Sequence, residues 1–306
     1  MDLIKRKEVK ISNESFSFIH LEGDNKDKNI FFFHATGFNA ETYKPFFLRL
    51  HEILDCQYSI YALDQRGHGL SKASAIPSKL TSWKTYFEDG KKFVDTFISS
   101  ENILMGHSMG GVVASRLAFD FKNKIYKSIL IDPVLQPQSL KLQIPFFNIS
   151  NYFFISLINF LKKNRASEMI TNAKKRRSVF SDKQEIFNHY QGRGAFKNWP
   201  EDSLKSYING GVVSQSNQIH LSCEPDWEAK TFAVSYSAST SFIKKIKTST
   251  YVPFASEGST LAPEFREFLS SNKNFIFEKI DGTHFFPMEK KDLICNKILN
   301  FIMNHE

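Results

Sequence analysis

The hydrophobic positions in the first 135 residues alternate between two spacings. Between the strand-like runs, apolar residues recur at helical spacing over 43–54, 83–98 and 110–121. Strands that alternate with helices are typical of an α/β fold, so the pattern predicts a doubly wound, mostly parallel sheet. The short runs that predict strands are Lys7–Ile11, Ser15–Leu21, Ile30–Phe33, Tyr58–Leu63, Ile103–Met105 and Ser128–Ile131.

The alternation stops near Gln136 and resumes beyond Ser235. Strand patterns return at 250–255 and 275–280, and a closing helix has apolar residues from Leu293 to Ile302 on one face. We therefore predict an α/β core formed by residues 1–135 and 236–306. Residues 136–235 are predicted to form an inserted, mainly helical cap over the carboxyl edge of the sheet, where open α/β folds bind ligands.

Residues 144–161 form an apolar run that is long enough to raise the question of a membrane span. The run contains Pro145 and three asparagines, Asn148, Asn151 and Asn159, which would be costly in hydrocarbon. We therefore expect a buried or pocket-lining helix here.

The charge of the chain is unevenly distributed. The formal net charge is +8, and the segment 162–197 alone holds ten Lys or Arg against three Asp or Glu. Such a cluster is typical of a solvated helical face, and it can also attract an anionic substrate or an anionic membrane surface. Aromatic residues are not interleaved with these charges as a single-strand groove requires, so we expect no nucleic-acid partner.

The three cysteines, Cys56, Cys223 and Cys295, are far apart in the sequence. An odd number without close spacing favours neither a disulfide framework nor a zinc site, and we expect no metal and no organic cofactor. The basic first residues are not followed by the apolar core of a secretory signal. A reducing, cytoplasmic location is therefore the expectation.

Residues 106–111 read GHSMGG and match the pattern G-x-S-x-G, with Ser108 at the centre. They join a predicted strand to a predicted helix, the context in which a nucleophile elbow holds a serine hydroxyl clear of the sheet. The alternative is a glycine-rich turn whose serine only caps the helix, which does not account for glycines on both sides.

His284 is the candidate base that would activate Ser108. A serine hydroxyl is a poor nucleophile until a base takes its proton. In this topology the triad follows the chain order serine, acid, histidine, and His284 comes directly after the last predicted strand, 275–280. The other histidines considered come too early, lie in the predicted cap, or adjoin Ser108.

These motifs make the chain resemble the α/β-hydrolase family, over residues 7–133 and 248–303 and more loosely in the cap. Residues 31–38 resemble the family's oxyanion loop, 63–71 its D-x-R-G-H-G-x-S loop, and 282–289 its catalytic-histidine loop. The resemblance implies that the backbone N–H groups of Thr36 and Met109 form the oxyanion hole, where each donor contributes about 3 kcal/mol. Ala35 departs from the usual glycine of this loop, and the alternative for residues 34–38 is a tight turn without a catalytic role.

The triad acid is less clearly marked. In the family it usually follows the strand before the histidine strand, where this chain has Ser259. A serine cannot supply the negative charge that stabilises an imidazolium. Asp132, at the end of the predicted strand 128–131, is our first candidate and Glu257 the alternative. Their non-catalytic interpretations are a helix N-cap and a solvated loop carboxylate.

The sequence thus predicts a serine hydrolase that cleaves a small carboxylic ester, with or without an anionic group, through an acyl-enzyme. Alternatives on the same triad are a C–C bond hydrolase, a thioesterase and an acyltransferase. Ser259 motivates a different alternative, a non-catalytic scaffold that binds a small ligand. A membrane-surface protein that uses residues 144–177 is a further alternative. The oligomeric state does not follow from the sequence.

Overall fold

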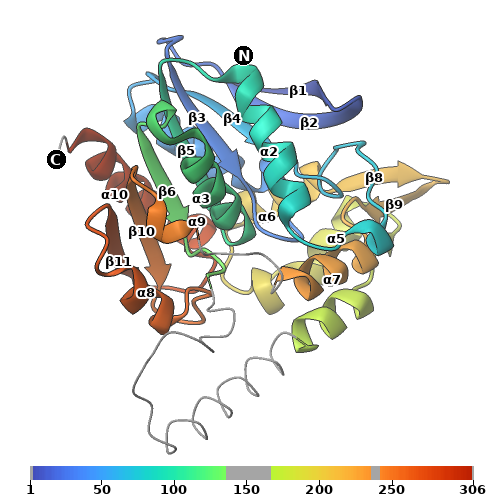
Figure 1. Cartoon of the computed structure of the whole chain (residues 1–306). Helices are drawn as coiled ribbons and strands as arrows, with labels where there is room; N and C mark the ends of the chain where they lie inside the picture. The colour runs from blue at the N-terminus through green and yellow to red at the C-terminus, as the bar shows by residue number, and fades with distance from the viewer. Residues whose placement is uncertain (1–2, 136–166, 236–241, 305–306) are drawn as a thin grey trace, which may run out of the picture.

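The computed structural model describes residues 3–135, 167–235 and 242–304, and these form an eight-stranded sheet in the order β1-β2-β4-β3-β5-β6-β10-β11 (Figure 1). β2 pairs antiparallel with β1 and with β4, and every other neighbouring pair is parallel. The doubly wound, mostly parallel sheet predicted from the sequence is confirmed. The strands are β1 (Ile4–Ile11), β2 (Glu14–Leu21), β3 (Lys28–Phe33), β4 (Ser59–Leu63), β5 (Glu101–His107), β6 (Lys127–Ile131), β10 (Ser249–Ala255) and β11 (Phe275–Ile280).

Helices cover both faces of this sheet (Figure 1). Ile30 and Phe32 of β3 join the apolar core that contains α1 and α10, whereas Phe31 and Phe33 join the core that contains α2 and α3. Successive side chains of a strand point to opposite faces, so a continuous apolar run such as β3 is buried on both sides. The helices of this part are α1 (Lys44–Ile53), α2 (Lys84–Phe97), α3 (Met109–Phe121), α8 (Pro263–Leu269), α9 (Phe286–Glu289) and α10 (Lys291–Met303), and the 3-10 helix η1 (Ala40–Tyr43) precedes α1.

The segment between β6 and β10 contains helices and a small sheet. In its described residues, three strands form an antiparallel sheet in the order β7-β9-β8, which the sequence did not predict. The reason is their length: β7 has two residues, and β8 and β9 have four each, too few for a clear alternation. The elements are β7 (Val179–Phe180), α5 (Lys183–Tyr190), α6 (Glu201–Gly210), β8 (Val212–Gln215), β9 (Gln218–Leu221) and α7 (Pro225–Ala233).

The inserted segment packs on loops that follow the strands of the main sheet. The indole Nε1–H of Trp227 in α7 donates to the Arg66 carbonyl at 3.1 Å, in the loop after β4. The Asn39 side-chain amide, in the loop after β3, donates to the Tyr207 carbonyl of α6 at 3.0 Å. These loops lie at the carboxyl edge of the sheet, which supports our proposal that the insertion is a cap.

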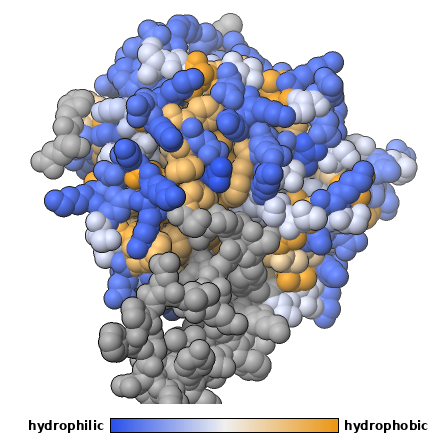
Figure 2. Space-filling view, in the orientation of Figure 1, coloured by the Kyte–Doolittle hydropathy of each residue, from blue (hydrophilic) through white to orange (hydrophobic). Residues whose placement is uncertain are grey.

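The apolar run at 144–161 lies outside the described residues, as does part of the basic segment. In the part of the chain that the structure describes, no helix is long and apolar enough to cross a membrane. Figure 2 shows that hydrophilic residues cover most of one face of the molecule, with apolar residues gathered near its middle.

The junction of β5 and α3 is packed so closely that only glycine fits at two positions. A Cβ atom at Gly106 would lie 2.1 Å from the Gly110 carbonyl oxygen, and one at Gly110 would lie 1.9 Å from the Phe33 carbonyl oxygen. Both neighbours are backbone atoms of the sheet or helix, so they can move only if α3 shifts away from β3 and β5.

We predict that Gly110→Ala lowers the free energy of unfolding by about 3 kcal/mol or more, because the added methyl group forces α3 to shift away from β3 and β5. The matched control is Gly192→Ala, which has φ +70° but no atom within 4 Å of the added Cβ. That change should cost only about 1 kcal/mol of backbone strain. Urea denaturation of both variants measures the difference, and equal losses would contradict the close packing.

Candidate active site

Ser108 lies at the sharp turn between β5 and α3. Its backbone has φ 57° and ψ −118°, a region that residues with a side chain rarely adopt. The Ser108 N–H donates to the Ile131 carbonyl at 3.0 Å, and its own carbonyl accepts from the Val134 N–H at 3.3 Å. The strained turn is therefore bonded to residues on both sides of Asp132. The Ser108 residue is 7% exposed.

The Asp132 carboxylate is completely buried and accepts four hydrogen bonds. His284 Nδ1 and the Ser259 hydroxyl each lie 2.5 Å from one of its oxygens. The backbone N–H groups of Thr260 and Ala255 donate at 3.1 Å and 3.2 Å. A buried charge is tolerable only where donors satisfy it, as they do here.

These contacts determine the charge of Asp132. Burial raises its pKa, but the hydrogen bond and charge of His284, with the donors from Ser259 and Thr260, outweigh burial and lower the pKa below its ordinary value. An ionised carboxylate only accepts hydrogen bonds, so His284 Nδ1 carries the proton between them. The other ring nitrogen of His284, Nε2, is then the one that can take a proton.

The two candidate acids are placed differently. Asp132 contacts His284, whereas Glu257 is exposed, and its backbone N–H donates to the Gly282 carbonyl at 3.0 Å. Ser259, at the position where the family usually has its acid, donates its hydroxyl proton to Asp132. Sequence reasoning missed this contact, because a serine at that position gives no local sign of its partner.

Thr36 and Met109, the predicted oxyanion-hole residues, lie in contact. The Thr36 hydroxyl is 3.4 Å from the Met109 sulfur, which links the loop after β3 to the first residue of α3. The N–H groups of the first helical turn have no acceptor within the helix, and they lie at the positive end of its dipole. The Met109 N–H is therefore suited to bind a developing negative charge.

Two buried side chains hold the loop after β3, the predicted oxyanion loop, in place. The Gln65 N–H donates to His34 Nε2 at 2.9 Å, so His34 is neutral with its proton on Nδ1, and that nitrogen donates to the Ala35 carbonyl at 2.8 Å. Burial lowers the pKa of His34 to about 4, which keeps this ring neutral. His34 thus has a structural position in the loop and is buried away from solvent.

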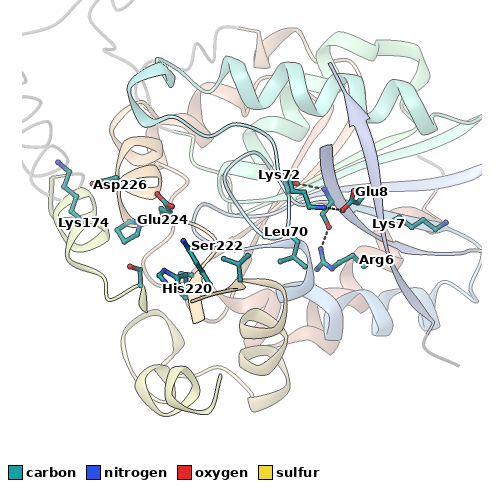
Figure 3. Close-up of a pocket in the computed structure, with 18 residues that line it drawn as sticks. Arg6, Lys7, Glu8, Leu70, Lys72, Lys174, His220, Ser222, Glu224 and Asp226 are labelled. Carbon is teal, nitrogen blue, oxygen red and sulfur yellow. Dashed lines mark hydrogen bonds and ion pairs between the residues drawn. The ribbon is translucent and has the colours of Figure 1, made fainter. Parts of the chain in front are cut away.

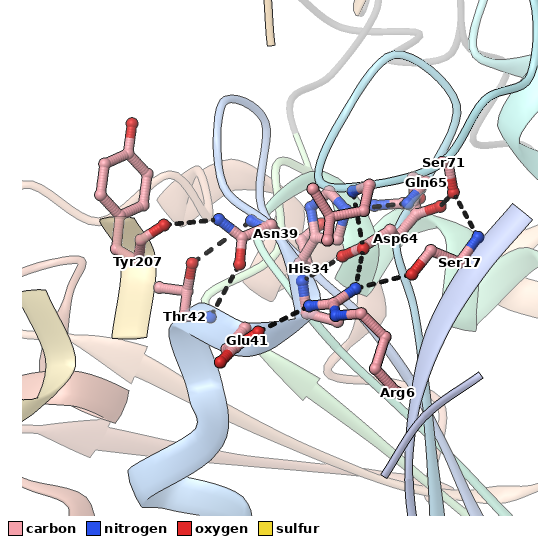
Figure 4. Close-up of polar contacts among 12 residues, drawn as sticks. Arg6, Ser17, His34, Asn39, Glu41, Thr42, Asp64, Gln65, Ser71 and Tyr207 are labelled. Atoms are coloured by element: carbon pink, nitrogen blue, oxygen red, sulfur yellow. Dashed lines mark hydrogen bonds and ion pairs between the residues drawn. The ribbon is translucent and has the colours of Figure 1, made fainter. Parts of the chain in front are cut away.

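The second of these side chains is Asp64, which lies between β4 and the same loop (Figure 4). Its carboxylate is completely buried and accepts from Arg6 Nη1 at 2.5 Å, the Ala40 N–H at 2.8 Å and the Leu70 N–H at 2.9 Å. Gly69 permits this, because a Cβ there would lie 2.2 Å from the carboxyl carbon.

An ion pair of the inserted segment lies against the oxyanion loop. Arg176 Nη2 and Glu228 Oε2 are 3.0 Å apart, and both side chains are largely buried. A Cβ at Gly37 would lie 2.3 Å from Glu228 Oε1, and Gly37 itself has φ +77°. The loop can therefore pass beneath this carboxylate only with glycine at position 37.

Aromatic rings from three segments pack together between this loop and the histidine loop. The ring centroids of Phe38 and Trp199 are 5.2 Å apart, those of Trp199 and Phe285 are 5.9 Å apart, and those of Phe38 and Tyr207 are 5.8 Å apart. Phe285 directly follows His284. This buried aromatic cluster therefore fixes the position of the histidine loop relative to the loop after β3.

A separate open groove of about 900 Å³ lies between β1, the loop after β4 and the inserted segment (Figure 3). Its lining includes Lys72, Lys174, His220, Glu224 and Asp226, but none of the six predicted site residues. Among the described residues there is no group of three or more His, Cys, Asp or Glu side chains that could hold a metal ion.

Comparison with known proteins gives partial sequence matches. A family model described as serine aminopeptidase, S33, matches residues 24–192. Protein ABHD8 of Bos taurus is 29% identical over 114 residues, which are 36% of this chain and 25% of that protein. The 2-(acetamidomethylene)succinate hydrolase of Mesorhizobium japonicum is 28% identical over 111 residues, 36% of this chain and 37% of that enzyme. The matches therefore span only 25% and 37% of the length of these two relatives.

The similarity in structure extends over the whole chain. The crystal structure of E-2-(acetamidomethylene)succinate hydrolase superposes with a TM-score of 0.77 at 16% identity, and the match covers 98% of this chain and 100% of that one. At this identity the likeness establishes a shared fold.

Four buried histidines make the stability of the protein sensitive to acid. Burial lowers the pKa of His20 and of His34 to about 4, of His68 to about 3, and of His107 well below its ordinary value. In an unfolded chain a histidine has a pKa of about 6.5. Between these values the unfolded chain binds protons that the native protein does not, so the stability present above pH 6.5 is lost as the pH falls.

We predict that the free energy of unfolding decreases from pH 7 to pH 5, by up to about 1.4 kcal/mol per pH unit for each of these histidines. Urea denaturation at pH 7, 6 and 5 measures the slope. His68→Gln should make the dependence of the free energy of unfolding on pH shallower, because one fewer proton is bound on unfolding. This holds whatever the substitution does to stability at pH 7. If the slope is the same in His68→Gln and the unmodified protein, the lowered pKa of His68 is contradicted.

Proposed function

Because this chain belongs to the serine aminopeptidase S33 family of α/β-hydrolases, we propose that it is a serine hydrolase that cleaves a carboxylic ester. The observation that carries the proposal is the hydrogen bond from His284 Nδ1 to the buried Asp132 carboxylate, beside the elbow that holds Ser108. A nucleophile, a base and an acid at one edge of a sheet are the parts that acyl transfer requires.

The first step is attack by Ser108 on the substrate carbonyl. His284 Nε2 takes the hydroxyl proton as the new C–O bond forms, and the charge that develops on the imidazole is stabilised by Asp132. The carbonyl oxygen becomes an oxyanion that accepts hydrogen bonds from the Thr36 and Met109 N–H groups. The imidazolium then gives its proton to the leaving alcohol, which departs and leaves an acyl-enzyme.

Hydrolysis of the acyl-enzyme repeats these roles with water. His284 takes a proton from water, the resulting hydroxide attacks the acyl carbon, and Ser108 leaves with the proton returned from His284. A thioester, a C–C bond or an acceptor other than water can use the same groups. An ester is the first substrate class to test, because an alcohol leaves with less help from a general acid than an amine does.

Ser259 bears on the alternative of a non-catalytic scaffold. That alternative rests on the absence of an acidic residue at the family's usual position. The hydrogen bond from the Ser259 hydroxyl to Asp132 supports catalysis instead, since it lowers the pKa of an acid supplied by the neighbouring strand.

We predict hydrolysis of a p-nitrophenyl ester series that depends on Ser108 and has an optimum in acyl chain length. Ser108→Ala should abolish the rate above background. Asp132→Asn should lower kcat by up to about 10⁴-fold, because an amide no longer stabilises the imidazolium. Initial rates across the series measure both effects.

Glu257→Gln is the matched control, since it makes the same chemical change at the other candidate acid. Its kcat should stay within about twofold of the unmodified enzyme, as expected for an exposed carboxylate. A large loss in Glu257→Gln with normal turnover in Asp132→Asn would exchange the two roles. No Ser108-dependent rate on any ester, and no labelling of Ser108 by a fluorophosphonate, would favour the scaffold.

A second candidate substrate carries an anionic group. The name of the relative from Mesorhizobium japonicum specifies a succinate derivative, a dicarboxylate. In this chain Lys174 and Lys175 are exposed and directly precede Arg176, which lies against the oxyanion loop. Exposed cations next to a site raise the local concentration of an anionic substrate.

We predict that kcat/KM for an ester with a free carboxylate falls as ionic strength rises, because salt screens exposed charges beyond about 10 Å at 0.1 M. A neutral ester of the same length should show little change. The two substrates are compared between low and high sodium chloride, with Lys174→Gln/Lys175→Gln expected to remove the difference. An equal response of both esters would reject the anionic substrate.

A further inference from the structure

A chain of hydrogen bonds crosses the buried side of the site from the oxyanion loop to the histidine loop. The Ala35 N–H lies 3.2 Å from the Tyr43 hydroxyl oxygen. That oxygen is 2.7 Å from His107 Nδ1, and His107 Nε2 is 2.9 Å from the His284 carbonyl oxygen. Tyr43 and His107 are both completely buried.

The proton positions in this series of hydrogen bonds follow from the groups at its two ends. The His284 carbonyl can only accept, so His107 Nε2 carries a proton. Burial and the nearby His284 ring lower the pKa of His107 well below its ordinary value, so His107 is neutral and its Nδ1 must accept. Burial also raises the pKa of Tyr43, which keeps the hydroxyl as the donor to Nδ1. The Tyr43 oxygen in turn accepts from the Ala35 N–H.

This series of hydrogen bonds includes a residue at or next to each part of the proposed reaction centre. Ala35 directly precedes Thr36 in the oxyanion loop, His107 directly precedes Ser108 at the elbow, and the last acceptor belongs to His284 itself. The rings of His107 and His284 also lie against each other, with centroids 4.6 Å apart. A displacement of about 1 Å between reacting groups can cost on the order of 100-fold in rate.

We propose that Tyr43 and His107 are positioning residues that set the spacing between the oxyanion donors, the nucleophile and the catalytic base. The inference rests on the proposed function. The Tyr43 hydroxyl selects the tautomer of His107 that donates to the His284 backbone, and it holds the Ala35 N–H at the same time. Neither residue touches the substrate in this role.

The competing explanation is that these bonds serve only the stability of the core. Tyr86 provides a matched control for it. Tyr86 is 1% exposed, and its hydroxyl lies 2.9 Å from the Thr231 hydroxyl, in a contact between α2 and α7. Tyr43→Phe and Tyr86→Phe therefore each remove one buried hydroxyl, which bonds to Ala35 and His107 in the first case and to Thr231 in the second.

The test compares these two variants in kcat, KM and urea midpoint on the best p-nitrophenyl ester. Tyr43→Phe should lower kcat about 10- to 100-fold with KM within about threefold, because the transition state is misaligned while binding is retained. Tyr86→Phe should keep kcat within about threefold at a comparable loss of urea midpoint. Equal kcat values in the two variants would overturn the positioning role.

A second pair of variants addresses His107 directly. Glutamine can place its amide N–H near the position of His107 Nε2 and donate to the His284 carbonyl, whereas leucine fills similar space without a donor. His107→Gln should retain at least about tenfold more kcat than His107→Leu. If the leucine variant does not fold, the tyrosine pair decides alone.

The outcome for the unmodified enzyme separates the two proposals. If it shows no Ser108-dependent hydrolysis and no labelling of Ser108 by a fluorophosphonate, the proposed function fails and the positioning role fails with it. If it is active and Tyr43→Phe matches Tyr86→Phe, only the positioning role is overturned.

Discussion

The buried carboxylate of Asp132 is the interaction on which the arrangement of the site depends. Its four donors come from the end of β10, the loop that follows β10, and the loop that follows β11. Ile131, which precedes Asp132, and Val134, two residues after it, bond to the backbone of Ser108. The end of β6 thus connects the turn at Ser108, the loop of His284 and the loop that follows β10. Removing the Asp132 carboxylate would leave several buried donors without an acceptor.

The geometry of the parallel sheet is a second constraint on the site. Parallel strands bring their carboxyl ends to one edge at a spacing of about 4.8 Å, so residues far apart in sequence become neighbours. The glycines at 106 and 110 let α3 approach β3 and β5 without an intervening side chain, which points the helix N-terminus at the same edge. Ser108 and the Met109 N–H are therefore positioned by backbone packing, and the side chains around them refine this position.

The sequence predicted those parts of the fold that leave a local pattern. Apolar runs such as Ile30–Phe33 mark buried strands, and the glycines around Ser108 mark the turn between strand and helix. The Tyr43–His107 chain leaves no such pattern, because its residues are 64 positions apart and meet only through the tertiary fold. The same holds for the small sheet of the insertion, whose strands are too short for periodicity. The roles assigned to Ser108, His284 and Asp132 remain proposals that the geometry supports.

The placement of the acid on β6 and of Ser259 in the loop after β10 has a physical logic. Two carboxylates beside one imidazole would repel, and each would raise the pKa of the other. With the acid on β6, a hydrogen-bond donor at position 259 is more useful than a second acid, because it stabilises the charged form of Asp132. The hydroxyl of Ser259 and the N–H of Thr260 both do so, and the pKa of Asp132 stays low despite its burial. The departure from the family's pattern at position 259 thus leaves a negative charge beside His284, which Asp132 supplies.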